Sequence, residues 1–348
     1  MHAIQVNAGG PSIAAARPSS SYVPCITFTP GQMAAEMGEQ RIGQLVAERT
    51  NQKRFFYGIE LMASNIRGKP TCVDFNNFLP LLPTFVSIVW LSQRYWGVEP
   101  VDQVESLQLT EHLATNIPVL THLSAYRLDK ERLDKLLAMN ITSVLAVRGD
   151  QVHEGQDYQI SLPIVVESKQ KRGEKISVCV GGYPEGYTSL GDFPPDLAKN
   201  MEYLKAKVSA GADCIITQLS YQPEVIVQFV RDCRAAGITI PIVIGLMAHE
   251  SIRTYRAIQK IANIHLPTDL REELNQLIAA DGKDMITDQD PIKKFFVRLT
   301  VETVRHILDA DVGIWGFHFF TLNHFKPVKA VLQELRKQNL LKDLEQDK

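Results

Sequence analysis

Residues 143–151 have the sequence SVLAVRGDQ, an apolar run that stops abruptly at Arg148, Gly149 and Asp150. The apolar part has the length and the β-branched content of a buried strand. Seven similar runs, rich in Val, Ile and Phe, occur elsewhere in the chain from residue 55 onward. Together the eight predicted strands cover residues 55–62, 84–91, 117–123, 142–149, 176–183, 212–219, 240–247 and 313–320.

Helical periodicity separates many of these runs. The spacing predicts helices over residues 129–139, 195–210 and 223–236, and a further helix that begins at Asp290-Pro291. Asp129 is a suitable N-cap for the first of these helices. Strands that are almost continuously apolar are covered on both faces, which is typical of a parallel sheet.

Eight such strands alternating with helices predict an α/β protein with a single-domain (β/α)8 barrel, the TIM-barrel fold. The alternative is an open doubly wound sheet. It is disfavoured because no Gly-rich dinucleotide fingerprint follows any of the runs, and Gly181-Gly182 leads into Tyr-Pro rather than into a helix.

The composition limits the classes of function. The chain has 348 residues, is 45% hydrophobic and has a formal net charge of −2, which favours a packed core and gives no support to nucleic-acid or membrane partners. No run of about 18 apolar residues exists that could span a bilayer. We therefore expect small-molecule substrates, and a homo-oligomer stays possible.

The five cysteines (Cys25, Cys72, Cys179, Cys214 and Cys233) are scattered and include no C-x-x-C pair. This pattern is typical of a reduced, intracellular protein. The first residues are rich in Ser, Gly and Pro, so we predict a disordered or poorly ordered tail over residues 1–40 and a barrel over residues 41–348. A cytoplasmic location is expected, with a mitochondrial targeting peptide as the minor alternative, because that tail carries very few Arg residues.

In a barrel of this kind the reactive groups gather where the strands end. The predicted strand ends carry Glu60, Trp90, His122, Arg148 with Asp150, Tyr183, Gln218, Met247 with His249, and His318 leading to Asn323. Each of these has a structural interpretation as well, such as a buried ion pair or a hydrogen-bonded core histidine. Their concentration at one rim favours a site.

The absence of certain residue types from the predicted strand ends argues against some classes of enzyme. No Lys ends any of the predicted strands, which argues against a Schiff-base enzyme. No H-x-H or H-x-x-E-H pattern exists, so we expect no metal, and a metal-dependent barrel hydrolase is a weak alternative that rests on His122, His249, His318 and Asp150. An adhesion function for the Arg-Gly-Asp tripeptide is also disfavoured, because the tripeptide ends a buried strand. A carboxyl in an apolar strand, an Arg–Asp pair, aromatic rings and amides suit a planar heteroaromatic ligand that carries phosphate.

Several motifs at these strand ends resemble the methylenetetrahydrofolate reductase family. The strongest are LAVRGD (145–150), KVSAGADCIITQL (207–219) and GFHFFTLN (316–323), with THLS (121–124) and GGYPEG (181–186) in support. The resemblance runs from about residue 55 to about residue 335. It implies a barrel that holds FAD across the strand ends, and a nicotinamide nucleotide, NADPH or NADH, that uses the same flavin face as the folate.

The resemblance also implies roles for individual residues. Glu60 would be the general acid and a folate contact, and Asp150 the acidic residue near flavin and pterin. Gln218 and Asn323 would contact folate. The implied flavin-binding positions are His122, Arg148, Gly149, Asp150, Tyr183 and Lys207.

The residue types agree with that chemistry. Arg and Lys neutralise a diphosphate. A carboxyl buried among apolar residues can keep the proton that a ring-opening step needs on its leaving nitrogen. We therefore expect reduction of 5,10-methylenetetrahydrofolate to 5-methyltetrahydrofolate by ping-pong hydride transfer, a reaction of one-carbon metabolism that supplies methionine biosynthesis.

The sequence departs from the family pattern at Leu61-Met62, Val89, Tyr187 and Ser220-Tyr221. These departures support a second hypothesis, a family member that binds flavin or folate with little turnover. The chain also stops soon after the eighth run. We therefore expect the form that consists of the catalytic barrel only, without the regulatory domain for adenosylmethionine that animal-type enzymes often carry.

Overall fold

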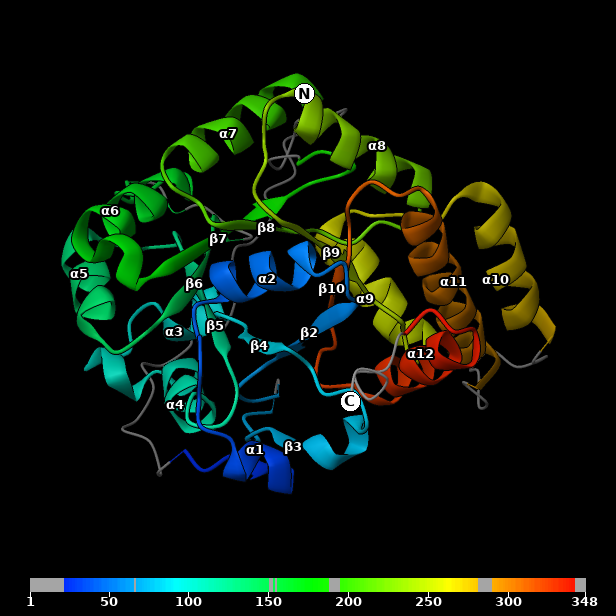
Figure 1. Cartoon of the computed structure of the whole chain (residues 1–348), viewed down its shortest axis with the longest axis horizontal. Coiled ribbons are helices and arrows are strands. Elements are labelled where there is room, and N and C mark those ends of the chain that lie inside the picture. The colour runs from blue at the N-terminus through cyan, green and yellow to red at the C-terminus, as the bar shows by residue number, and fades with distance from the viewer. Residues whose placement is uncertain are drawn as a thin grey trace, which may run out of the picture.

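Eight parallel strands form a closed barrel in the order β10, β2, β4, β5, β6, β7, β8, β9 (Figure 1). The structure is a computed structural model that describes residues 22–65, 67–149, 153, 155–187, 195–280 and 290–341. The strands are β2 (Phe56–Leu61), β4 (Phe85–Ile88), β5 (Val119–Ser124), β6 (Ser143–Val147), β7 (Ser177–Gly182), β8 (Cys214–Thr217), β9 (Ile242–Leu246) and β10 (Gly316–Phe319). Seven of them lie within the predicted runs, and β5 extends one residue beyond its run, to Ser124, so the predicted (β/α)8 barrel is confirmed.

The helices on the outside of the barrel are α3 (Ser92–Tyr95), α4 (Glu105–Leu113), α5 (Lys130–Ala138), α6 (Leu162–Arg172), α7 (Leu197–Ser209), α8 (Pro223–Ala235), α9 (Ile252–Ala262), α10 (Thr268–Ala280), α11 (Asp290–Asp309) and α12 (Lys326–Lys337). Short 3-10 turns lie at Phe75–Phe78, Val101–Gln103 and Gly173–Lys175. The helices predicted from periodicity are α5, α7, α8 and α11. Asp129 caps α5 as expected, since its carboxylate accepts from Arg132 N.

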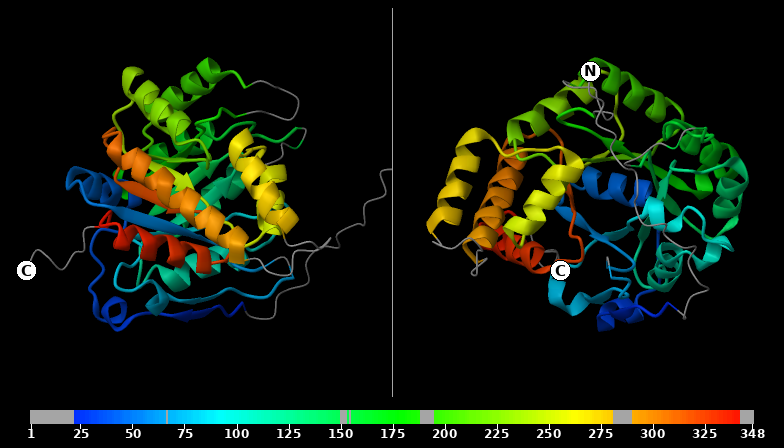
Figure 2. Two further views of the ribbon diagram at one scale, coloured as in Figure 1. Left: turned by 90° about the vertical axis from the view of Figure 1, so that its right-hand side faces the viewer. Right: turned by 180° about the vertical axis from the view of Figure 1, so that it is seen from behind.

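Alternate residues of each strand face the interior and the surrounding helices. Phe56, Phe85, Leu120, Leu145 and Cys179 belong to an interior cluster, whereas their neighbours along the strands pack in the core beneath the helices. Figure 2 shows α11 (orange) and α12 (red) lying side by side on the outside of the barrel. No helix in the described part of the chain is long and apolar enough to cross a membrane.

Helix α2 (Ile42–Asn51) lies across the end of the barrel at which the strands begin (Figure 1). Its first backbone amides donate to the first residues of two strands: Ile42 N lies 2.8 Å from Ser143 Oγ, and Gly43 N lies 3.1 Å from Ser177 Oγ. Ile42 is fully buried in the interior cluster together with Val46. The helix therefore closes the lower end of the barrel and leaves the opposite end for chemistry.

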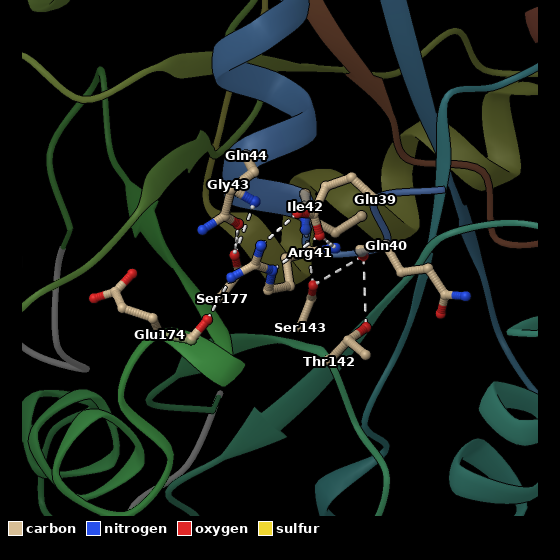
Figure 3. Close-up of polar contacts among 10 residues, drawn as sticks. All are labelled: Glu39, Gln40, Arg41, Ile42, Gly43, Gln44, Thr142, Ser143, Glu174 and Ser177. Atoms are coloured by element: carbon tan, nitrogen blue, oxygen red, sulfur yellow. Dashed lines mark hydrogen bonds and ion pairs between the residues drawn. The ribbon is translucent and has the colours of Figure 1, made fainter. Parts of the chain in front are cut away.

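Polar contacts at the start of α2 fix this closure (Figure 3). Arg41 donates to the carboxylate of Glu39 and, over 2.6 Å, to the carbonyl of Glu174 at the turn before β7. Gln44 Oε1 accepts from Ser177 Oγ at 2.8 Å. The contacts with Glu174 and Ser177 join residues more than a hundred positions apart in the sequence.

The close approach of α2 to the strands leaves no room for a side chain at Gly43. A Cβ atom there would collide with Asp213 Cβ and Ser177 Oγ. We expect Gly43→Ala to lower the free energy of unfolding by about 1–3 kcal/mol, the usual effect of overpacking. The thermal midpoint measures this, with Gly38→Ala as control because a Cβ at Gly38 meets nothing within 4 Å. Equal midpoints for the two variants would contradict the close contact.

Part of the N-terminal segment, predicted to be a tail over residues 1–40, is structured from Tyr22 onward. It forms β1 (Cys25–Thr27) and α1 (Pro30–Ala34), and β1 pairs in parallel with β3 (Cys72–Asp74). Thr29 and Gln32 cap α1 reciprocally. β1 is held by β3, which lies in the connection between β2 and β4. Composition does not reveal a pairing of this kind. The remainder of the predicted tail up to residue 21 lies outside the described residues.

Candidate active site

A cavity of about 1010 Å³ opens at the ends of β6 and β7, beside α7. It extends between α6, α7 and α8, and its lining combines cations, amides and aromatic rings with the carboxylates of Asp196 and Asp232. The cations, amides and rings include Arg148, Tyr183, Tyr187, Asn200, Tyr203 and Lys207. Three of these, Arg148, Tyr183 and Lys207, are positions that the family resemblance implied for the flavin. Leu197 and Tyr203, also on its wall, are about half exposed, so apolar surface is available to a ligand there.

Arg148 lies directly after β6 and points into this cavity. Its Nη1 donates to the Tyr187 hydroxyl at 3.0 Å, and the guanidinium lies 5.4 Å from the centre of the Tyr187 ring. Its Nε is buried and has no hydrogen-bond partner among the residues that the structure describes. A buried donor without a partner is costly, so a hydrogen bond to an anionic ligand would stabilise this group.

Gly149 allows the chain to turn away from β6. Its φ of +90° is unfavourable for other residues, and a Cβ atom would lie 2.5 Å from Ser124 Oγ. The hydroxyl of Ser124 also accepts from Tyr126 N. Glycine is therefore required by the close approach of the turns after β5 and β6. Asp150, the predicted acidic residue beside it, lies outside the described residues.

Lys207 reaches the cavity from α7. Its ammonium donates to the carbonyl of Gly181 at 3.2 Å, and burial lowers its pKa to about 8. At neutral pH the group therefore stays mostly protonated, as a diphosphate ligand requires. The rings of Tyr183 and Tyr187 lie 4.8 Å apart on the same wall.

Asn200 is a residue of this site that sequence reasoning missed. Its amide holds the backbone of Tyr187 at both ends: Tyr187 N donates to Asn200 Oδ1 at 3.0 Å, and Asn200 Nδ2 donates to Tyr187 O at 3.3 Å. The signal available in the sequence was its spacing, two helical turns before Lys207 on the same face of the helix. Asn200 positions Tyr187, which in turn contacts Arg148.

Glu60 lies near the end of β2, on the side of the barrel opposite β7, and points into the interior. Its side chain is buried, and burial raises its pKa to about 7, against the smaller opposing effect of backbone hydrogen bonds from Thr321 and Leu322. The Thr321 hydroxyl also donates to the Glu60 carbonyl at 2.6 Å. The carboxyl can therefore hold a proton near neutral pH.

Two histidines share this interior with Glu60. Burial lowers the pKa of His122 to about 4 and that of His318 to about 3, so both imidazoles are neutral at physiological pH. His318 Nε2 lies 2.8 Å from Ser87 Oγ, and Ser87 is the register partner of Glu60. His122 Nε2 is buried without a partner among the described residues. Neither ring stabilises the Glu60 carboxylate by charge.

The two residues implied for folate lie at different places on the rim. Gln218 follows β8, and its Oε1 accepts from Leu219 N at 2.9 Å. Asn323 follows β10; its amide accepts from Met62 N at 2.9 Å and donates to Met62 O at 2.9 Å and to Thr71 Oγ1 at 3.0 Å. The Asn323 amide thus joins the loops after β10 and β2, and its contact with folate stays a prediction.

Two other residues from the predicted strand ends pack internally. Trp90 is buried edge-on against Tyr95, with ring centres 5.7 Å apart. His249 Nε2 lies 2.7 Å from the Tyr221 hydroxyl in a second apolar cluster formed with α9 and α11. In the described part of the chain no three His, Cys, Asp or Glu side chains gather as metal ligands would.

The quoted motifs end at four strands of the barrel and supply Arg148 after β6, Tyr183 after β7, Gln218 after β8 and Asn323 after β10. Comparison with known proteins decides the family. A sequence profile of the family described as methylenetetrahydrofolate reductase matches residues 46–336. The chain belongs to the methylenetetrahydrofolate reductase family. The resemblance seen in the motifs is thereby confirmed.

Individual members of the methylenetetrahydrofolate reductase family are distant from this chain. A "Probable methylenetetrahydrofolate reductase (NADH)" from Oryza sativa subsp. japonica is 30% identical over 259 residues, which is 69% of this chain and 42% of that protein. A "Probable methylenetetrahydrofolate reductase (NADPH)" from Caenorhabditis elegans is 25% identical over 323 residues, 86% of this chain and 44% of that protein. The chain thus spans less than half the length of these relatives.

A solved structure supports the fold. An uncharacterised protein from Clostridium thermocellum, described as binding two copies of 5-methyl-5,6,7,8-tetrahydrofolic acid, superposes with a TM-score of 0.53. The match covers 85% of this chain and 99% of that chain at 13% sequence identity. At that identity the likeness concerns the barrel alone.

Proposed function

We propose that this protein reduces 5,10-methylenetetrahydrofolate to 5-methyltetrahydrofolate with NADPH or NADH, through bound FAD. Membership of the methylenetetrahydrofolate reductase family supports the reaction class. The observation that carries the proposal is the pairing of a cation-lined cavity with a buried carboxyl across the barrel whose pKa is about 7.

The residues of the cavity fit a flavin dinucleotide. The volume of about 1010 Å³ lies at the upper end of the range of small-molecule sites. The partly unsatisfied guanidinium of Arg148 and the desolvated ammonium of Lys207 suit a diphosphate. Gly149 permits the close approach of the turn after β6 to Ser124, and Tyr183 offers an aromatic surface to the ligand. FAD, when bound, would take hydride from the nicotinamide and pass it to the folate.

Glu60 supplies the proton of the folate half of the reaction. The carbon to be reduced is bridged between two nitrogens, so the five-membered ring must open before hydride arrives. Opening requires a proton on the leaving nitrogen, and the protonated Glu60 carboxyl donates it. The neutral His122 and His318 keep the surroundings of this carboxyl uncharged, which preserves its proton near neutral pH.

This assignment gives a pH dependence with a defined sign. Burial raises the pKa of Glu60 from 4.5 to about 7, so the acid form predominates below pH 7 and disappears above it. We expect kcat/KM for methylenetetrahydrofolate to fall as pH rises through about 7. Oxidation of NAD(P)H with a quinone acceptor, which needs no acid at Glu60, should lack this decline. An increase of kcat/KM across the same range would contradict the role as acid.

The direct test is a visible spectrum of the purified full chain followed by one assay. The two absorption bands of oxidised flavin and NAD(P)H-dependent formation of 5-methyltetrahydrofolate are the expected results. A colourless protein that gains no colour from added FAD would overturn the proposal. Running the assay with NADPH and NADH separately determines the nucleotide, since the named relatives include both kinds.

A second candidate is a family member that binds flavin or folate with little turnover. Two observations favour it: Arg148 already engages Tyr187, a departure from the family pattern, and the Asn323 amide is satisfied by Met62 and Thr71. Flavin absorption without turnover of either nucleotide would support this alternative.

A further inference from the structure

Two cysteines face each other in the small sheet that joins the N-terminal segment to the barrel. β1 and β3 are parallel, and Cys25 is the direct register partner of Cys72. Neighbouring strands lie about 4.8 Å apart, which is within the range of Cα separations that disulfides accept. Side chains of register partners lie on the same face of a parallel sheet. The backbone already holds the two thiols where a bond between them needs little movement.

Both thiols are accessible. Cys25 and Cys72 are exposed, whereas Cys179, Cys214 and Cys233 are buried. The two exposed cysteines line a second cavity of about 560 Å³, which gives a small reagent room to approach. A hydrogen bond between the two thiols raises the pKa of Cys72, so its reactive thiolate is scarce at neutral pH and the rate of exchange should increase with pH.

We propose that Cys25 and Cys72 are a site of reversible disulfide formation with a low-molecular-weight disulfide, of which oxidised glutathione is the physiological type. The thiolate of one cysteine attacks a sulfur of the reagent, breaks its S–S bond and releases one thiolate product. The second cysteine loses its proton and attacks the mixed disulfide, which forms the intramolecular bond and releases the second product. Two protein thiols are oxidised and one disulfide is reduced to two thiols.

The bond would fasten the N-terminal segment to the loops around the rim. Tyr22 donates to the Ala63 carbonyl at 2.7 Å, just beyond Glu60 along the chain. Thr71, next to Cys72, accepts from Asn323, which also holds Met62. A cross-link between Cys25 and Cys72 closes a long loop in the unfolded chain, so the oxidised protein should have a thermal midpoint a few degrees higher.

The test oxidises the full-length protein with oxidised glutathione, then alkylates free thiols in denaturant and measures the mass. Wild type should fall from five alkylated cysteines to three, and a non-reducing peptide map should join the peptides of Cys25 and Cys72. The rate should increase with pH. Dithiothreitol should restore all five thiols and the lower thermal midpoint.

Single variants provide matched controls, because both positions are exposed and serine is close to cysteine in size. Cys25→Ser should leave Cys72 as a mixed disulfide with glutathione, and Cys72→Ser should leave Cys25 in the same state, without the rise in thermal midpoint. Five alkylated cysteines after oxidation of wild type, or a linkage that involves a buried cysteine, would overturn the proposal. No outcome depends on turnover, so the site is tested separately from the proposed reductase.

Discussion

Replacing Glu60 with glutamine should reduce the turnover of methylenetetrahydrofolate by about 10²- to 10⁴-fold, the range typical of general acid catalysis. Glutamine keeps the shape of the side chain and its place among the backbone amides of Thr321 and Leu322, but it has no carboxylic proton. Oxidation of NAD(P)H with a quinone acceptor should stay close to wild type, because that half of the reaction needs no proton from the protein. Stopped-flow absorbance follows the two halves separately.

Glu185→Gln is a suitable control for this experiment. Glu185 follows β7, is partly buried and has a pKa that burial raises, but its carboxylate accepts from Ser220 Oγ at 2.6 Å in a loop contact. We expect a far smaller effect from this change. If Glu60→Gln slows both halves equally, Glu60 is a structural residue. If it slows neither, the acid lies elsewhere and Asp150 is the next candidate.

The second large effect is expected for Arg148→Ala, which should weaken FAD binding. Hydrogen bonds to charged groups contribute roughly 1.5–3 kcal/mol, which corresponds to about a 10- to 100-fold increase in Kd. The buried Nε has no described partner, so its contribution depends on the ligand rather than on the fold. Titration of the apoprotein with FAD, followed by the quenching of flavin fluorescence, gives the Kd.

Three further variants separate charge from packing. Arg148→Lys should recover only part of the affinity, since an ammonium cannot present two parallel donors. Tyr187→Phe keeps the ring but removes the acceptor of Arg148 Nη1, so FAD binding should be retained or tightened. Arg231→Ala removes a charge from the exposed side of α8 and should leave the Kd for FAD unchanged. Full flavin occupancy of Arg148→Ala after dilution and dialysis would refute this assignment.

The barrel was predictable because each strand carries its own signal. A run such as residues 240–247 is apolar over the length of one strand, and helices such as α8 show their period beside it. Such local patterns repeat eight times here, and handedness rules leave little choice of order for strands joined by helices. The order of the strands around the barrel therefore followed from the order of the sequence.

The N-terminal segment was not predictable by the same reasoning. β1 has three residues, and its partner β3 lies beyond β2, so its signal is a pairing rather than a pattern. The same holds for α2, whose contacts with Ser143 and Ser177 join distant parts of the chain. Short elements held by distant partners leave little trace in local composition.

For the site, sequence reasoning identified residue types but not their surroundings. Arg148, Tyr183 and Lys207 come together at one cavity, and their contact with flavin stays a prediction. The backbone contacts of Asn200, and the use of the Asn323 amide between two loops, depend on side-chain directions that no motif records. The raised pKa of Glu60 was foreseen because its neighbours in the strand are apolar.

The position of α2 has a consequence for the order of events during synthesis. Gly43 is synthesised 134 residues before Ser177, so at about 5–20 residues per second the two are separated by roughly 7–27 s. During this interval Ile42 and Val46 lack the partners that bury them. The strand pair that closes the barrel, β2 with β10, comes later still, because Gly316 pairs with Phe56. The growing chain therefore exposes the apolar side chains of α2 through much of translation, before the barrel that covers them is complete.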